Sequence, residues 1–304
     1  MNSAISVSGL RKTYGSLVAV DGISFEVPVG EIFGMVGPNG AGKTTTIECL
    51  EGMRTAEEGG IRLLDLDPRG DGYELRERIG IQLQQSALPD DIKVWEALDL
   101  FSSYYRRAVP WEPLLERLGL AEKRNAAFAK LSGGQKQRLF IALALINDPE
   151  LVFLDELTTG LDPHARRSMW DLVRDIRARG KTLFLTTHYM EEAEHLCDRV
   201  LVIHRGRIVA LDTPEHLVGG LAEEVRILFT ADRPFDLQGL RDLSGVTSVE
   251  RSGDRVTVTG RGDRLVWLVV NALDAQGVKF RGLRTEQPNL EDVFLALTDE
   301  ASES

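Results

Sequence analysis

Residues Gly37–Thr45 read GPNGAGKTT, and this stretch decides the fold. It matches the pattern G-x-x-x-x-G-K-S/T, with Lys43 and Thr44 at its last two positions. Glycines let backbone N–H groups wrap phosphate oxygens, and the N-terminus of a following helix adds partial positive charge. An apolar run, EIFGMVG (31–37), precedes the loop, and a helix-forming run, KTTTIECLEGM (43–53), follows it. The sequence therefore predicts a strand, a phosphate-binding loop (P-loop) and a helix.

A second apolar run, LVFLDE (151–156), ends in two carboxylates. Open α/β sheets bind ligands at the carboxyl edge of their strands, so Asp155 and Glu156 are expected there. Adjacent strand residues point in opposite directions. We therefore expect Asp155 to hold Mg²⁺, through water, and Glu156 to orient the attacking water. Alone, such a run fits any strand that ends in a polar turn. The P-loop upstream favours the reading as a metal-binding and catalytic strand end.

The order of apolar and helix-forming segments along the chain predicts an α/β fold. Compact apolar strands separated by helices indicate a parallel sheet that is buried on both faces. Residues 4–36 begin with short alternating strands, and residues 94–129 turn helical and interrupt the rhythm. After about residue 222 the order becomes β-α-β-β-α-β plus a last helix, a split βαβ arrangement.

Bulk properties exclude several classes. The 304 residues suggest about two domains. The net charge of −11 disfavours a nonspecific grip on nucleic acid. The longest apolar run, residues 139–146, is far shorter than the roughly 20 residues that span a bilayer. The two cysteines fit no metal-ligand spacing and no disulfide framework, so we expect buried, reduced thiols.

A second glycine pair lies in LSGGQ (131–135), directly before a helix-forming run. Ser132 is a good helix N-cap, and Gly133 and Gly134 allow close approach to bare backbone. One P-loop needs only one phosphate pocket. The second site is therefore expected to serve the nucleotide of another chain.

The P-loop, LSGGQ, LVFLDE and the strand end TTH (186–188) together resemble the ATP-binding subunit of an ABC transporter, over about residues 1–220. The resemblance implies a P-loop NTPase (RecA-like) core with an N-terminal antiparallel β subdomain and an inserted helical lobe at about 90–148. We place this ATP-binding domain at 1–222 and a small α+β accessory domain at 223–304. In that family two subunits sandwich two ATP molecules head to tail.

The family's site residues carry over onto matching positions of this chain. ATP and Mg²⁺ are the implied cofactors. Glu156 and His188 would be catalytic, and Thr44, Gln84 and Asp155 would contact the metal. The residues implied in ATP binding are Tyr14, Gly37, Pro38, Asn39, Gly40, Ala41, Gly42, Lys43, Thr44, Thr45 and Gln84. Those implied in binding the ATP of the second subunit are Ser132, Gly133, Gly134, Gln135 and Asp162.

Three of these assignments have plain structural alternatives. Tyr14 at a strand end is ordinarily a packing residue, and Asp162 is also a natural helix N-cap. Gln84 would otherwise be an exposed polar residue at a strand end, and its neighbour Gln85 competes for the same role. The chain also departs from the family at Leu157, where proline usually follows the two carboxylates and would make the loop stiffer.

The tail EQPNLEDVFLALT (286–298) and the run TTTIECLEGM (44–53) resemble the drug-resistance, daunorubicin-exporter-like ABC-2 branch of bacteria. That branch implies a homodimer, a separate polytopic membrane permease, outward transport of a drug or other small or lipophilic molecule, and a peripheral place on the cytoplasmic face of the cell membrane. An importer subunit is the nearest alternative.

A soluble ABC-type ATPase that acts on nucleic acid or ribosomes is a further alternative. It is disfavoured because the chain has no sustained heptads, no cysteine cluster, a single cassette and a negative net charge. A P-loop kinase or small GTPase gives no reason for LSGGQ.

Overall fold

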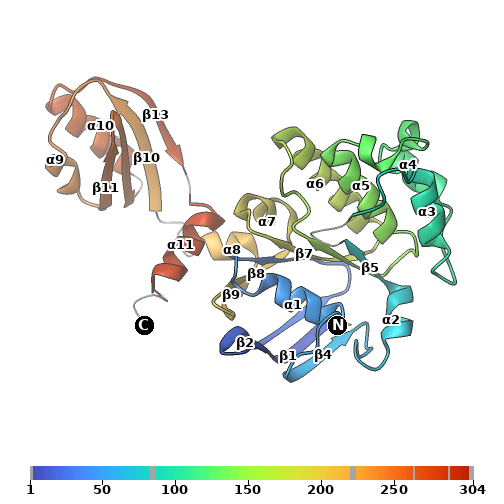
Figure 1. Ribbon diagram of the computed structural model, residues 1–304. Coiled ribbons are helices and arrows are strands. Elements are labelled where there is room, and N and C mark those ends of the chain that lie inside the picture. The colour runs from blue at the N-terminus through green and yellow to red at the C-terminus, as the bar shows by residue number, and fades with distance from the viewer. Residues whose placement is uncertain (1–2, 83–86, 220–223, 263, 287, 301–304) are drawn as a thin grey trace. The chain divides into compact units, whose positions relative to one another are not determined.

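The computed structural model describes residues 3–82, 87–219, 224–262, 264–286 and 288–300 (Figure 1). The chain divides into two compact units, Met1–Pro214 and Glu215–Ser304. The division falls at the start of helix α8 (Pro214–Gly219), a few residues before the boundary at 222 expected from the sequence. Among the described residues, no helix is long and apolar enough to span a membrane.

A six-stranded sheet forms the centre of the first unit, in the order β5-β6-β7-β3-β8-β9. Its strands are β3 (Ile32–Val36), β5 (Ile79–Gln82), β6 (Leu151–Asp155), β7 (Thr182–Thr187), β8 (Arg199–His204) and β9 (Arg207–Asp212). All neighbours are parallel except β8 and β9, which form an antiparallel hairpin. Every residue of β3, β6 and β7 is buried, which explains why their sequences are mainly apolar and do not alternate with polar residues.

A second sheet of three antiparallel strands has the order β2-β1-β4. It consists of β1 (Ser3–Tyr14), β2 (Leu17–Pro28) and β4 (Glu58–Leu63). Helix α1 (Lys43–Leu50) lies between this sheet and the six-stranded one (Figure 1), and its Ile47 and Leu50 share one core with Phe25 of β2 and Phe33 of β3. The predicted antiparallel subdomain and the strand–loop–helix around the P-loop are confirmed.

The predicted helical insertion between β5 and β6 is also confirmed. It contains α3 (Val94–Ser102), α4 (Trp111–Arg117), the short 3₁₀ turns η1 (Ala121–Lys123) and η2 (Phe128–Lys130), and α5 (Gly133–Ala144). The other helices of this unit are α2 (Gly72–Arg78), α6 (Pro163–Ala178) and α7 (Met190–Leu196). Both cysteines of the chain, Cys49 and Cys197, are free and buried, as predicted.

The second unit has the predicted β-α-β-β-α-β order. Its elements are β10 (Glu224–Ala231), α9 (Gln238–Arg241), β11 (Val246–Ser252), β12 (Arg255–Arg261), α10 (Leu265–Ala275), β13 (Phe280–Glu286) and α11 (Leu290–Glu300). The strands form one antiparallel sheet in the order β11-β12-β10-β13. Phe229 and Val258 from the sheet pack with Val269 and Leu273 of α10 in a separate core.

Candidate nucleotide-binding site

A cavity of about 790 Å³ lies over the P-loop. Its walls come from the β1–β2 turn, the loop itself, the segments that follow β6 and β7, and the β8–β9 turn. They comprise Tyr14, Leu17, Val18, Ala19, Asn39, Gly40, Gly42, Lys43, Thr44, Thr45, Glu156, Thr159, His188 and Arg205. The fold therefore brings most residues predicted for ATP binding and catalysis to one cavity, although they come from distant parts of the chain.

Two P-loop glycines are required by close backbone approach. A Cβ at Gly37 would lie 2.3 Å from the carbonyl oxygen of Ile203, and one at Gly42 would lie 2.5 Å from that of Ala19. Gly42 also has a φ of 110°, a conformation that side-chain-bearing residues rarely adopt. The loop is thus held tightly against β2 and β8, and only glycine fits at these two positions.

Lys43 places its charge inside the loop. It is the first residue of α1, is 4% exposed, and its Nζ donates hydrogen bonds to the carbonyls of Gly37 (2.7 Å) and Pro38 (3.1 Å). Burial lowers the pKa of Lys43, while the nearby carboxylates of Glu156 and Asp155 oppose that shift. An anion bound in the loop interacts strongly with this ammonium because little water separates the charges.

Asp155 is a buried carboxylate at the end of β6. It is 4% exposed, and the hydroxyl of Thr186 donates a hydrogen bond to its Oδ1. Burial raises the pKa of Asp155, the Thr186 bond opposes that shift, and Glu156 adds to it. The carboxylate of Asp155 and the hydroxyl of Thr44 are hard oxygen donors, which Mg²⁺ prefers, so these residues fit the ion.

Glu156 differs from the sequence expectation. Strand β6 ends at Asp155, and Glu156 has a φ of 48°, so the idea that both carboxylates lie on the strand is wrong. A left-handed non-glycine residue costs roughly 1–3 kcal/mol and is typical of functional sites. This turn brings Glu156 to the cavity wall, where its Oε1 lies 3.5 Å from Nδ1 of His188. The hydroxyl of Thr159 donates to the other carboxylate oxygen at 3.3 Å.

Tyr14 ends β1 at the rim of the cavity and is 39% exposed. The ammonium of Lys12 and the guanidinium of Arg54 each lie 5.4 Å from the centre of its ring. Cation–π contacts of this kind hold an aromatic ring in place without covering all of it. The position suits stacking on a flat base.

Arg205, which no sequence motif indicated, also lines the cavity. Arg205 has a φ of 48° in the β8–β9 turn, and this turn is tied to the P-loop because the N–H of Gly206 donates to the carbonyl of Ala41 at 2.9 Å. Locally, HRGR indicates only a turn. The contact depends on β8 lying beside β3 in the sheet, which no local pattern shows.

The LSGGQ segment lies outside this cavity. Ser132 caps α5 as predicted: its hydroxyl accepts from the N–H of Gln135 (3.3 Å), and the Gln135 side chain accepts from the N–H of Ser132 (3.0 Å). Among the described residues, a Cβ at Gly133 would have no heavy atom within 4 Å, and one at Gly134 would meet only Ala165, at 3.8 Å. Ala165 belongs to the first turn of α6, so the starts of α5 and α6 lie close together.

Asp162 is the N-cap of α6, and its Oδ1 accepts from the N–H groups of His164 and Ala165 at 2.9 Å each. These bonds hold the pKa of Asp162 below its usual value, with that to Ala165 the stronger influence. Gln84 and Gln85 lie outside the described residues. Leu157, the residue at which the chain departs from the proline of the resembled family, is buried and 3% exposed.

The fold and the cavity define a P-loop NTPase with an inserted helical lobe. The model of the family described as ABC transporter matches residues 20–159. The Nod factor export ATP-binding protein I of Ralstonia nicotianae is 40% identical over 97% of this chain and 93% of its own length. The protein of the same name from Paraburkholderia xenovorans is 41% identical, and the alignment covers 97% of both chains.

Solved structures of ABC transporter ATP-binding subunits have the same fold. The ATP-binding subunit of an ABC transporter superposes with a TM-score of 0.65 at 26% identity, over 72% of this chain and 93% of that one. The cbiO1 protein of Clostridium perfringens, part of the ABC transporter complex cbiONQ, gives a TM-score of 0.66 at 26% identity, over 72% and 92%. The chain belongs to the ABC transporter family as an ATP-binding subunit, and it is an ATPase.

Proposed function

We propose that two copies of this chain close around two ATP molecules and drive export through a separate membrane permease. One observation supports the proposed dimer. The packing of the described residues does not require the glycines of LSGGQ, since a Cβ at Gly133 meets no heavy atom within 4 Å and one at Gly134 makes only ordinary contact. Gly37 and Gly42, by contrast, are required within the chain. The open space at Gly133 and Gly134 suits close approach by a phosphate bound to a second copy.

We assign the site residues the following roles. The P-loop and Lys43 bind the phosphates, and Tyr14 stacks on the base. Thr44, Asp155 and Gln84 are the protein's candidates for holding Mg²⁺, which neutralises phosphate charge. Glu156 orients the attacking water for in-line displacement, and His188, 3.5 Å from it, keeps that carboxylate and the γ-phosphate in register.

The second subunit contributes Ser132, Gly133, Gly134, Gln135 and Asp162. The short distance between the starts of α5 and α6 supports this grouping, because Gly134 and Ala165 belong to the same surface. Residues 223–304 form an accessory domain in this proposal, with a regulatory or dimer-stabilising role.

Export is proposed because the relatives that match over nearly the whole chain are named export proteins. We infer a small or lipophilic cargo, selected by the permease. A second cavity, of about 330 Å³ between α2 and α3, suits contact with that permease. It is lined in part by aromatic side chains, and Tyr73 and Tyr104 are 86% and 66% exposed. Exposed aromatic clusters are typical of protein interfaces.

Purification of the tagged chain from detergent-solubilised native membranes, with Lys43→Ala as a nucleotide-binding control, tests the proposal. A stoichiometric polytopic protein that comes down with the chain would support it. Recovery of only ribosomes or nucleic acid would instead support the soluble alternative. Uptake rather than efflux in vesicles reconstituted with that permease would support an importer. Wild-type turnover in Lys43→Ala would contradict the P-loop assignment.

A further inference from the structure

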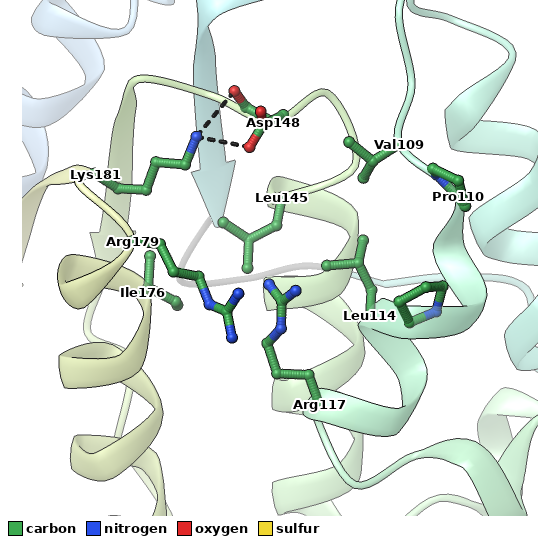
Figure 2. Close-up of a pocket in the computed structure, with 10 residues that line it drawn as sticks. Val109, Pro110, Leu114, Arg117, Leu145, Asp148, Ile176, Arg179 and Lys181 are labelled. Atoms are coloured by element: carbon green, nitrogen blue, oxygen red, sulfur yellow. Dashed lines mark hydrogen bonds and ion pairs between the residues drawn. The ribbon is translucent and has the colours of Figure 1, made fainter.

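A third pocket, of about 340 Å³ and with a charged rim, lies between α4 of the helical lobe and the end of α6 (Figure 2). Its walls come from three segments: α4 with the two residues before it, the residues that follow α5, and the end of α6 with the α6–β7 connection. They include Val109, Leu114, Arg117, Leu145, Ile176, Arg179 and Lys181. None of these residues lines the ATP cavity.

The pocket combines an apolar floor with a cationic rim. Leu114, Leu145 and Ile176 are 4%, 7% and 1% exposed and form the floor. Figure 2 shows the guanidinium groups of Arg117 and Arg179 reaching toward one another from opposite walls. Arg117 is the last residue of α4 and Arg179 is the C-cap of α6, positions where the helix dipole stabilises a cation. The dipole explains their place in the sequence but not their convergence over an apolar floor.

The charges of the rim are incompletely balanced. Three cationic side chains and one carboxylate, Asp148, line the pocket, and Asp148 already accepts from Lys181 at 2.6 Å. Arg179 pairs with Asp175 at 3.1 Å, but both side chains are more than 40% exposed, so this pair is weak and exchangeable. Within the described part of the chain, Arg117 makes no hydrogen bond or ion pair. The lining therefore carries a surplus of two positive charges on a protein whose net charge is −11.

We propose that this pocket binds a small phosphate monoester with an apolar group. Two guanidinium groups match the charge and geometry of a phosphate dianion, whereas a single carboxylate needs only one. The volume is near the lower end for ligand pockets, which suits a compact molecule. The ester's apolar part covers Leu114, Leu145 and Ile176. Such a ligand bridges the helical lobe and the sheet unit, so it can change how the lobe is held.

Phenyl phosphate is a suitable probe, measured by titration calorimetry on the full chain at a pH of about 8, where a phosphate monoester carries close to two charges. Saturating ADP blocks the P-loop, which would otherwise bind the probe itself. Binding at one site, with a dissociation constant below about 1 mM and tighter than for inorganic phosphate or phenol, is expected. Arg117→Gln and Arg179→Gln should each weaken it roughly tenfold or more.

Arg174→Gln is the matched control, because Arg174 lies on α6, is similarly exposed and pairs with Asp171, yet does not line the pocket. It should bind phenyl phosphate as the wild type does. ATPase rates without the probe report correct folding, since none of the three arginines lines the ATP cavity. Undiminished binding in both Arg117→Gln and Arg179→Gln, or no saturable binding to the ADP-loaded wild type, would overturn the proposal. Binding no tighter than that of inorganic phosphate would overturn the role of the apolar floor.

Discussion

Replacing Gly133 by alanine separates a structural role of LSGGQ from a role between two subunits. Gly133 is the first residue of α5, and a Cβ there meets no heavy atom within 4 Å in the part of the chain that the structure describes. Alanine lowers the entropy of the unfolded chain, so we expect the free energy of unfolding to rise by about 0.5 kcal/mol. If a phosphate on a second subunit must approach this backbone, the new methyl group weakens a charge-assisted hydrogen bond worth about 1.5–3 kcal/mol. ATP turnover should then fall roughly tenfold or more.

The assay combines urea unfolding with steady-state ATPase measurement at several protein concentrations. Gly72→Ala is the matched control, because Gly72 is the first residue of α2 and its Cβ would also meet no heavy atom. It should shift stability in the same way and leave turnover unchanged. A Gly133→Ala protein that is at least as stable as the wild type and hydrolyses ATP at the wild-type rate would refute the reasoning about the second subunit.

Glu156→Gln should retain ATP binding, lose about 100-fold or more in ATP turnover, and form an ATP-dependent dimer that light scattering detects. A monomer with intact hydrolysis would exclude both the water-orienting role of Glu156 and the dimer that encloses two ATP molecules. Arg205→Gly should remove the cost of a left-handed non-glycine residue and raise the free energy of unfolding by about 1 kcal/mol. The same change should weaken binding of a fluorescent ATP analogue several-fold. Arg207→Ala, which removes an arginine paired with Asp21 at 2.8 Å, should leave binding of that analogue unchanged. Burial, with smaller effects of Asp155 and Glu48, raises the pKa of Glu51 from 4.5 to about 8. Between these values the native state holds a proton that the unfolded chain has lost, so stability falls as pH rises, by up to about 1.4 kcal/mol per unit. Glu51→Gln should flatten that slope in chemical unfolding at pH values from about 5 to 8, and an unchanged slope would contradict the buried-carboxyl reading.

The local patterns of the chain were sufficient to predict the order of the main helices and strands and the position of the phosphate loop. The loop can be read from sequence because its chemistry is contiguous: glycines, a lysine and a threonine in one short run, between an apolar strand and a helix. The N-cap at Ser132 could be read for the same reason, since a capping box needs only Ser132 and Gln135, three residues apart. The β-α-β-β-α-β order of the second unit followed from alternation and turn residues.

Other features depended on contacts between distant segments. Arg205 reaches the ATP cavity only because β8 pairs with β3 and the turn after β8 is bonded to the P-loop. The left-handed turn at Glu156 needs its N–H bonded to the carbonyl of Thr186 on the neighbouring strand, and an apolar run that ends in two acids does not reveal it.

The sequence by itself thus determined which residues carry phosphate chemistry, because those residues act within a few positions of one another. Only the tertiary structure decided where their side chains meet. It placed His188 3.5 Å from Glu156, left open, among the described residues, the space that a Cβ at Gly133 would fill, and brought Arg117 and Arg179 to one pocket. These arrangements depend on sheet order and helix packing, because both bring together segments that lie far apart in the sequence.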